Sequence, residues 1–307
     1  MSRAGRTLVA AAAIAATAAV VAATAFGPAL ATAGRPAAGR SAARIATGIC
    51  SSAKHAKLAA RISKYVTAEL AKRPNSSVGL AISDKAEDLS CVLHAREHFI
   101  AASVIKVTII SALLLKEGGP SRLTAAQRNL AWQMITESDD NAANTLWNEV
   151  GISGMQTFLD KAAMRHTILN DAWGLTDLTA DDEITLLHVL TTANKVLGKN
   201  SRNYVLGLMA DVVPSQAWGV SAGAPSNVTV HIKNGWLPYP DTNLSATDWH
   251  INSIGAFTGK DIGYQIVVLT APSSGSDPQQ SEGYGITTIE DVAGVINREL
   301  ANASTSS

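Results

Sequence analysis

A serine three residues before a lysine opens an apolar run of the sequence. Ser103 and Lys106 begin this run, which continues to about Leu115. In a helix the two side chains share one face, about one turn apart. A serine hydroxyl becomes a nucleophile when a base takes its proton, and a lysine can be that base where burial lowers its pKa. The pattern therefore permits nucleophilic catalysis, but alone it is better explained as an ordinary helix start with an outward-pointing lysine.

Two later stretches carry side chains of the kinds used in acyl transfer. Ser138 is followed by Asp139 and Asp140 inside a tract with helical periodicity. Lys233-Asn234-Gly235 lies in a stretch with the alternation of a strand. The lysine offers a positive charge to a substrate carboxylate, and a glycine in a strand lets another chain or a ligand approach the backbone.

Taken together and in order, these stretches resemble a known set of motifs. Class A β-lactamases and penicillin-binding proteins carry Ser-x-x-Lys, then Ser-Asp-Asn, then Lys-Thr-Gly. This chain has Ser103-x-x-Lys106, Ser138-Asp139-Asp140 and Lys233-Asn234-Gly235, on a helix start, in a helical tract and on a strand. The similarity covers roughly residues 50 to 302, and it is closest to the shorter β-lactamase-like serine hydrolases of secreted actinobacterial type.

The resemblance implies a role for each matching residue. Ser103 corresponds to the acylated nucleophile and Lys106 to its base or proton relay. Ser138 corresponds to the group that passes a proton to the leaving nitrogen, and Lys233 to the cation that stabilises negative charge and holds the substrate carboxylate. The backbone N–H groups of Ser103 and Trp236 correspond to the oxyanion hole. The candidate substrate-binding residues are Asp140, Asn234, Gly235 and Trp236.

Three departures from the family pattern limit the expected activity. Asp140 stands where the family has an Asn that donates to the substrate amide carbonyl, and an ionised Asp cannot donate. The 35 residues from Ser103 to Ser138 are fewer than in typical class A enzymes. The short stretch 170–179 contains no Glu to activate a deacylating water, and Glu183 is expected on the helix that follows. The sequence therefore predicts a weak or atypical β-lactamase.

Two functions remain open on these observations. The first is a secreted serine hydrolase that forms an acyl-enzyme on a β-lactam or a D-Ala-D-Ala-like amide. The second is a catalytically impaired module of the same fold that binds cell-wall peptides. The complete set of Ser103, Lys106, Ser138 and Lys233 favours the enzyme, because a decayed site more often loses a member. We expect a monomer with a small-molecule substrate and neither cofactor nor metal; the 25 basic and 25 acidic residues argue against nucleic acid.

The periodicity of the chain predicts which elements position these residues. The predicted strands are Ser77–Ser83, Leu89–Leu93, Val228–Trp236, Trp249–Phe257 and Tyr264–Thr270; the predicted helices are 53–72, a broken tract over about 103–197, and 286–300. This order indicates an α+β fold: a five-stranded antiparallel sheet with both terminal helices on one face and an inserted all-helical subdomain. The catalytic domain is expected over 49–303, with the sheet part at about 49–100 and 225–303 and the helical part at about 101–224. A cleft between the two parts is the natural place for the site.

The N-terminus has the pattern of a secretory signal peptide. Arg3 and Arg6 precede an apolar run, and Ala29-Leu30-Ala31 is a small-x-small cleavage site. We expect a signal peptide at 1–31 and a flexible linker at 32–48, and hence secretion without a membrane attachment after cleavage. An uncleaved membrane anchor is the alternative, because the run is long enough to span a bilayer.

Cys50 and Cys91 are the two cysteines of the chain. An even number in an exported protein suggests one disulfide, which would attach the start of the domain to a strand. Two buried free thiols are the alternative.

Two other groups of residues receive a structural interpretation. His94-Ala95-Arg96-Glu97-His98 matches an inverted zinc-protease motif, but that motif requires a helix, and a polar connector is expected here. Among the tryptophans, Trp236 is expected at the cleft and Trp173 in the core.

Overall fold

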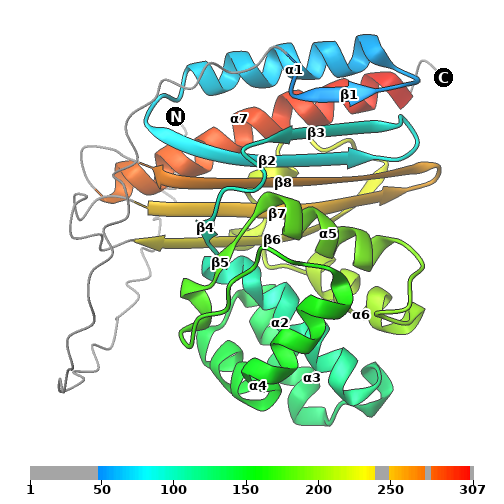
Figure 1. The fold of residues 1–307 in the computed structure, drawn as a ribbon, viewed down its shortest axis with the longest axis vertical. Coiled ribbons are helices and arrows are strands. Elements are labelled where there is room, and N and C mark those ends of the chain that lie inside the picture. The colour runs from blue at the N-terminus through cyan, green and yellow to red at the C-terminus, as the bar shows by residue number, and fades with distance from the viewer. Residues whose placement is uncertain (1–47, 239–248, 274–277, 305–307) are drawn as a thin grey trace, which may run out of the picture. The chain divides into compact units, whose positions relative to one another are not determined.

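An antiparallel sheet of six strands is the centre of the computed structural model, which describes residues 48–238, 249–273 and 278–304. The strands lie in the order β1-β3-β2-β8-β7-β6, so that β6 forms an edge (Figure 1). Their bounds are β1 (Cys50–Ser52), β2 (Ser76–Asp84), β3 (Leu89–Leu93), β6 (Val228–Pro238), β7 (Trp249–Gly259) and β8 (Ile262–Ser273). Side chains alternate between the two faces, so that Leu80 and Ile82 of β2 enter one core while Ala81 enters the other.

Two helices from the ends of the described chain cover one face of the sheet. They are α1 (Ala56–Ala71) and α7 (Pro278–Ser304), which pack against each other. Figure 1 shows α7 passing behind the strands. Leu58, Ile62 and Val66 form the apolar stripe of α1, and they join the sheet residues in one continuous apolar core.

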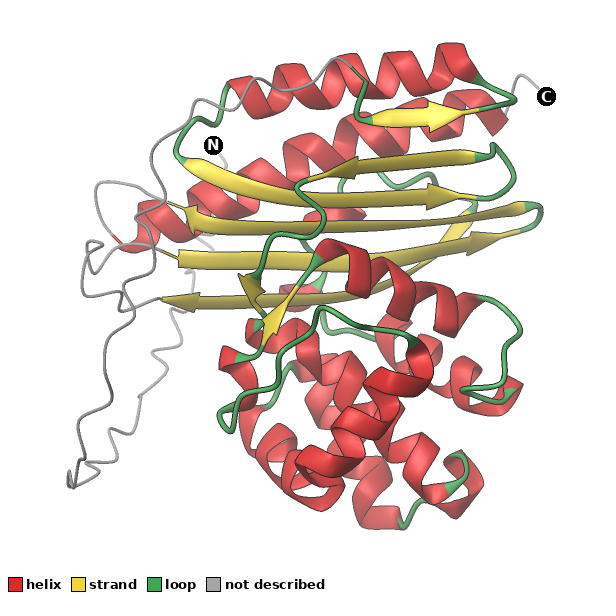
Figure 2. Cartoon of the chain, viewed as in Figure 1, coloured by secondary structure: helices red, strands yellow, loops and turns green. Residues whose placement is uncertain are grey.

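The chain between β3 and β6 is mostly helical and forms a block beside the sheet (Figure 2). A short ribbon of β4 (Phe99–Ile100) and β5 (Asp177–Leu178) ties the two halves of this block together. Helix α5 packs on β2, β7 and β8, so its apolar side chains close the second core. The helices and helical turns are η1 (Ala102–Val104), α2 (Ile105–Glu117), η2 (Pro120–Arg122), α3 (Ala125–Trp132), η3 (Gln133–Glu137), α4 (Asp140–Ala162), η4 (Trp173–Leu175), α5 (Ala180–Thr191), α6 (Lys199–Ala210), η5 (Pro214–Gln216) and η6 (Gly219–Ser221).

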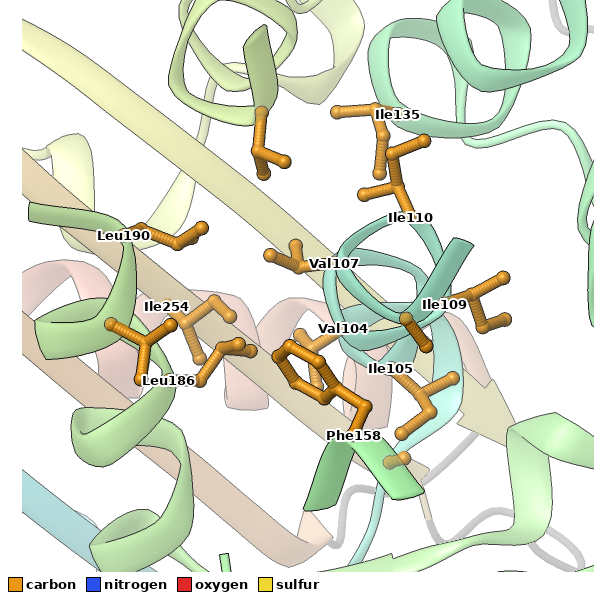
Figure 3. Packing of buried hydrophobic residues seen from close by; sticks show 14 of the residues in the cluster. Val104, Ile105, Val107, Ile109, Ile110, Ile135, Phe158, Leu186, Leu190 and Ile254 are labelled. Carbon is orange, nitrogen blue, oxygen red and sulfur yellow. The ribbon is translucent and has the colours of Figure 1, made fainter. Parts of the chain in front are cut away.

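Helix α2 is buried on every side. Val107, Ile109 and Ile110 leave the helix in different directions, and Ile135 and Phe158 lie among the side chains around them (Figure 3). A helix that is apolar all round belongs in a core rather than on a surface. The residues at its N-terminal end are therefore held by close packing rather than by a surface loop.

The predicted α+β fold, with both terminal helices on one face, is confirmed. The predicted number of five strands is wrong, because β1 supplies a sixth. This strand has three residues, too few to show an alternation. The C-terminal helix predicted over 286–300 is longer than expected, since α7 spans Pro278–Ser304.

The predicted signal peptide, residues 1–31, and the linker up to residue 47 lie outside the described residues. Within the described ranges, no helix combines the length and the apolar character that a membrane crossing requires.

Cys50 and Cys91 are joined by a disulfide in the structure, as the first of the two alternatives predicted. The pairing of β1 with β3 places the two residues directly opposite each other. The bridge therefore attaches the start of the described chain to the sheet.

Candidate active site

Ser103 lies in the 3₁₀ turn η1, which runs directly into α2. Asn252 of β7 holds the segment before it, because its side-chain amide donates to the carbonyl oxygens of Ile100 at 2.8 Å and Ala101 at 3.1 Å. Ala102 has a φ of 47°, a left-handed conformation that is unusual for a residue with a side chain. Backbone strain of this kind is often found at functional sites, where the surrounding structure enforces it.

Gly235 of β6 lets the sheet approach the serine. A Cβ atom at this position would lie 2.6 Å from the backbone nitrogen of Ser103 and 2.9 Å from that of Val104. The turn that carries the serine therefore rests directly on the edge strand. A larger residue would push the two apart.

Ser138 occupies the junction between the π-helical turn η3 and helix α4. Its φ of 61° is left-handed, and the N–H of the following Asp139 donates back to the carbonyl of Gln133. This local geometry interrupts the helix and turns the Ser138 hydroxyl toward α2 and β6. Single π-helical turns are frequent at functional sites.

Lys106 is fully buried and donates to both ends of this junction. Its Nζ lies 2.7 Å from the carbonyl oxygen of Ser138, 3.2 Å from Ser138 Oγ and 2.6 Å from Asp140 Oδ1. Burial lowers the pKa of Lys106, while the charge of Asp140 opposes this shift, and the net direction is downward. Asp140 thus partly preserves the ammonium that burial disfavours.

Lys233 approaches the same hydroxyl from the sheet. Its Nζ donates to Ser138 Oγ at 2.9 Å and to the carbonyl oxygen of Asn234 at 2.9 Å. The side chain is 1% exposed, and burial, followed by the positive charge of Lys106, places its pKa well below the ordinary value. Because Lys233 is buried, we expect it to affect a substrate through its hydrogen bond to Ser138 rather than by direct contact.

The structure thus brings Lys106, Ser138, Asp140 and Lys233 into one hydrogen-bonded cluster, with Ser103 three residues before Lys106. No hydrogen bond joins the Ser103 hydroxyl to either lysine or to Ser138 in the described residues. The serine is partly exposed, so a ligand can reach it.

The edge position of β6 orients the backbone near the serine. The carbonyl of Asn234 points away from β7, because it accepts from Lys233. Backbone groups in a strand alternate in direction, so the N–H of Trp236, two residues later, also points outward. The Trp236 side chain instead packs on the opposite face, 5.9 Å from the Trp218 ring.

Asn234 does not offer its amide to this cluster. Its Nδ2 donates to the carbonyl oxygens of Gln216 at 2.8 Å and Trp218 at 2.9 Å, and its Oδ1 accepts from Ser253 Oγ at 2.6 Å. The side chain is buried and all these partners lie on the far side of the strand. The predicted role of the Asn234 side chain in substrate binding therefore has no geometric support here.

Trp173 and Asn144 also belong to the site. The ring of Trp173 lies 4.8 Å from Lys106 Nζ, and its Nε1 donates to Asn144 Oδ1 at 2.7 Å. Trp173 also packs against the core, as predicted, but one ring face serves the ammonium. The sequence signal that could have identified Trp173 is a tryptophan in a short polar loop. The signal that could have identified Asn252 is a polar residue in the middle of an apolar strand.

In the described residues, the stretch 170–179 has Asp171 and Asp177 as its acids, and Asp177 pairs with Ile100, three residues before Ser103. Glu183 lies on α5, as predicted, but it is fully buried away from the lysines. His94 faces Glu97, whereas His98 bonds to the His166 carbonyl, so the two histidines diverge. The described ranges contain no group of three His, Cys, Asp or Glu side chains arranged for a metal.

The close approach at Gly235 gives a first testable prediction. Gly235→Ala is expected to lower the rate of Ser103 acylation about a hundredfold, because a nucleophile displaced by about 1 Å loses that much. Gly263→Ala is the matched control, since nothing lies within 4 Å of its added Cβ. Labelling rates with a fluorophosphonate probe measure both variants. Equal rates for the two would contradict a tight contact between β6 and the serine turn.

The sequence matches the model of one protein family, described as the β-lactamase enzyme family, over residues 116–300. This match spans more than half of the chain. It includes Ser138 and Lys233 and begins after Ser103 and Lys106. Comparison with curated proteins finds no match.

Solved structures of class A β-lactamases and of a penicillin-binding protein have similar folds. The class A β-lactamase from Bacteroides cellulosilyticus DSM 14838 has a TM-score of 0.65 and 16% identity, with 79% of this chain and 98% of that chain covered. PBP-A has a TM-score of 0.63 and 18% identity, covering 78% and 96%. A variant of the class A β-lactamase of the last common ancestor of Gram-negative bacteria has a TM-score of 0.59 and 21% identity, covering 75% and 94%. At these identities the likeness concerns the fold alone.

Proposed function

Since the chain belongs to the β-lactamase enzyme family, we propose that it is an exported serine hydrolase that forms an acyl-enzyme on Ser103. The substrate class is a β-lactam or a D-Ala-D-Ala-like amide. The observation that carries the proposal is the Ser138 hydroxyl, which lies within hydrogen-bond distance of both buried lysines. Burying two cations beside one hydroxyl costs stability, so a purely structural role is a poor explanation for it.

Acylation follows from the positions of these groups. Ser103 Oγ bonds to the substrate carbonyl carbon, and its proton passes to Lys106, whose pKa burial has lowered. The carbonyl oxygen takes the negative charge and faces the N–H groups of Ser103 and Trp236. The carbonyl double bond then re-forms as the carbon–nitrogen bond breaks. Ser138 gives its proton to the leaving nitrogen and takes in exchange the proton that Lys106 received, since Lys106 Nζ lies 3.2 Å from Ser138 Oγ, while Lys233 stabilises the Ser138 oxygen.

Deacylation is the slower step in this proposal. Water must attack the ester of Ser103, and the carboxylate nearest to the cluster, that of Asp140, is bound to Lys106. We therefore expect the acyl-enzyme to accumulate with β-lactams, and turnover to be weak.

Covalent labelling of Ser103 tests the proposal. Mass spectrometry after incubation with a fluorescent penicillin, a fluorophosphonate or a D-Ala-D-Ala peptide should show one adduct on the peptide that contains Ser103. Ser103→Ala should lose the adduct completely, whereas Ser153→Ala, at an exposed serine of α4, should retain it. Absence of an adduct with all three reagents would end the proposal.

A binding module is the second candidate, and the Lys106–Asp140 ion pair is the observation that favours it. A carboxylate this close keeps Lys106 protonated more of the time and so less able to act as a base. Calorimetry with wall peptides separates the two functions. If the protein is a binding module, the Ser103→Ala variant should bind wall peptides as tightly as the natural chain, and neither protein should release a product.

A further inference from the structure

Asp140 presents a free acceptor at the mouth of the candidate site. Its Oδ1 is bound to Lys106 Nζ at 2.6 Å, but its side chain is 71% exposed. In the described residues, Oδ2 has no hydrogen-bond partner. The residue lies at the start of α4, and Asn144 follows one turn later on the same face of the helix.

A carboxylate at this point sets a requirement on the ligand. An ionised carboxylate accepts hydrogen bonds and donates none, so a substrate carbonyl placed against Asp140 would bring two acceptors together. A donor placed there would gain a hydrogen bond, and a charged donor would gain a stronger one. The group that fits is therefore an N–H donor, best an ammonium.

We propose that Asp140 makes this site select acyl donors that carry a free ammonium group next to the scissile carbonyl, that is, amides or esters of unblocked amino acids. The inference rests on the proposed function, since Asp140 stands beside the Lys106 and Ser138 that serve Ser103. Lys106, one helical turn after Ser103, is bound to Asp140 at 2.6 Å, so the proposal places the α-substituent of an acyl group on Ser103 within reach of Asp140.

The surroundings of Asp140 are compatible with a cation. Asp139 and Asp140 place negative charge beside Lys106, and Asp140 also acts on Lys233. The indole ring of Trp173, which already lies over the Lys106 ammonium, forms an electron-rich wall beside the carboxylate. An Asn at position 140 would leave the cluster with an excess of positive charge and would favour neutral or anionic acyl groups.

A substrate ammonium at Asp140 also affects the base. It would compete with Lys106 for the carboxylate and add a positive charge nearby, and both effects favour the neutral form of the lysine. The free amine should therefore raise kcat as well as lower KM. No new co-reactant is needed, because the acyl transfer to Ser103 and then to water is unchanged.

Two substrates that differ only in the amine test this inference. They are D-alanine p-nitroanilide and its N-acetyl derivative, assayed with the full chain, with Asp140→Asn and with Glu137→Gln. Glu137 is an exposed acid of the same segment and controls for a general loss of charge. Fluorophosphonate labelling of Ser103 is measured in parallel on each protein.

The free amine should be preferred by at least about tenfold in kcat/KM, the effect of one charge-assisted hydrogen bond. Asp140→Asn should reverse this preference and should gain acylation by benzylpenicillin, whose side-chain amide carbonyl then meets a donor. Glu137→Gln should keep the original preference. If Ser103 is labelled but both substrates react equally, or the N-acetyl form reacts faster with the natural chain, the inference fails and the proposed function stands. If Ser103 is not labelled by any reagent, both fail.

Discussion

Lys233→Met is expected to lower the rate of Ser103 acylation about a thousandfold, within the range that general acid–base groups contribute. Lys233 Nζ lies 2.9 Å from Ser138 Oγ, and in the proposed mechanism it is the cation that stabilises this oxygen when the proton leaves for the substrate nitrogen. The methionine side chain has a similar volume but neither a charge nor a donor. The rate constant for β-lactam acylation, followed by intact-mass spectrometry, measures the loss.

The same substitution is expected to leave the fold intact or to stabilise it. Lys233 is 1% exposed and makes no salt bridge in the described part of the chain, whereas Lys106 has Asp140. Replacing a buried charge by an apolar group of similar size is often neutral or stabilising by about 1 to 4 kcal/mol. A rise or no change in the free energy of unfolding, combined with lost acylation, would show that the lysine is retained for chemistry.

Lys260→Met is the control for this prediction, because Lys260 is exposed in the turn between β7 and β8. It should change neither acylation nor stability. A Lys233→Met protein that unfolds much more easily would indicate a structural role. One that acylates at the natural rate would remove Lys233 from the mechanism.

The sequence predicted the parts of the site that depend on local spacing. Ser103 and Lys106 are neighbours on one helix, so their proximity follows from the helix repeat alone. Ser138 and Lys233 are distant in sequence, and their order and types were enough to place them through a resemblance, which the family match then supported. The convergence of Lys106 and Lys233 on the Ser138 hydroxyl is visible only in the structure.

The resemblance to family motifs did not predict which face of the sheet each side chain of the edge strand β6 points to. Asn234 follows Lys233 and therefore points to the opposite face, but a resemblance assigned both to the cleft. The Trp173 ring reaches Lys106 from a loop whose path depends on the β4–β5 ribbon. Strand β1 was missed because its three residues are held by pairing with β3 and by the disulfide, not by a pattern of their own.

Two adjacent acids on α5, Asp182 and Glu183, also could not be distinguished from the sequence, although their environments differ in the structure. Asp182 accepts from the backbone N–H of His166 at 2.8 Å and from Thr167 Oγ1 at 2.7 Å. Glu183, fully buried beside it, has no hydrogen-bond partner for either carboxyl oxygen in the described residues. Asp182 is therefore a structural carboxylate whose oxygens have hydrogen-bond partners. Glu183 is a buried carboxyl group whose ionised form the fold does not stabilise.

Glu183 should therefore make the stability of the protein depend on pH. Burial, with a smaller effect from the charge of Asp182, raises the pKa of Glu183 from 4.5 to about 8. Below the unfolded value the group is neutral in both states and costs nothing. Between the two values the unfolded chain ionises while the folded chain does not, so the free energy of unfolding falls by about 1.4 kcal/mol per pH unit. Above the folded value the loss levels off, at up to roughly 5 kcal/mol.

Glu183→Gln removes this titration, and urea unfolding from pH 4 to pH 9 measures the difference from the natural chain. The variant and the natural chain should be nearly equal at pH 4, and the variant should be more stable by an amount that grows up to about pH 8. Glu97→Gln, at a side chain 58% exposed, should show no such growth. A constant difference at all pH values would mean that Glu183 stays ionised inside the fold and has a partner that the structure does not contain. A growing difference would identify Glu183 as a neutral carboxyl kept within the core between α5 and the sheet.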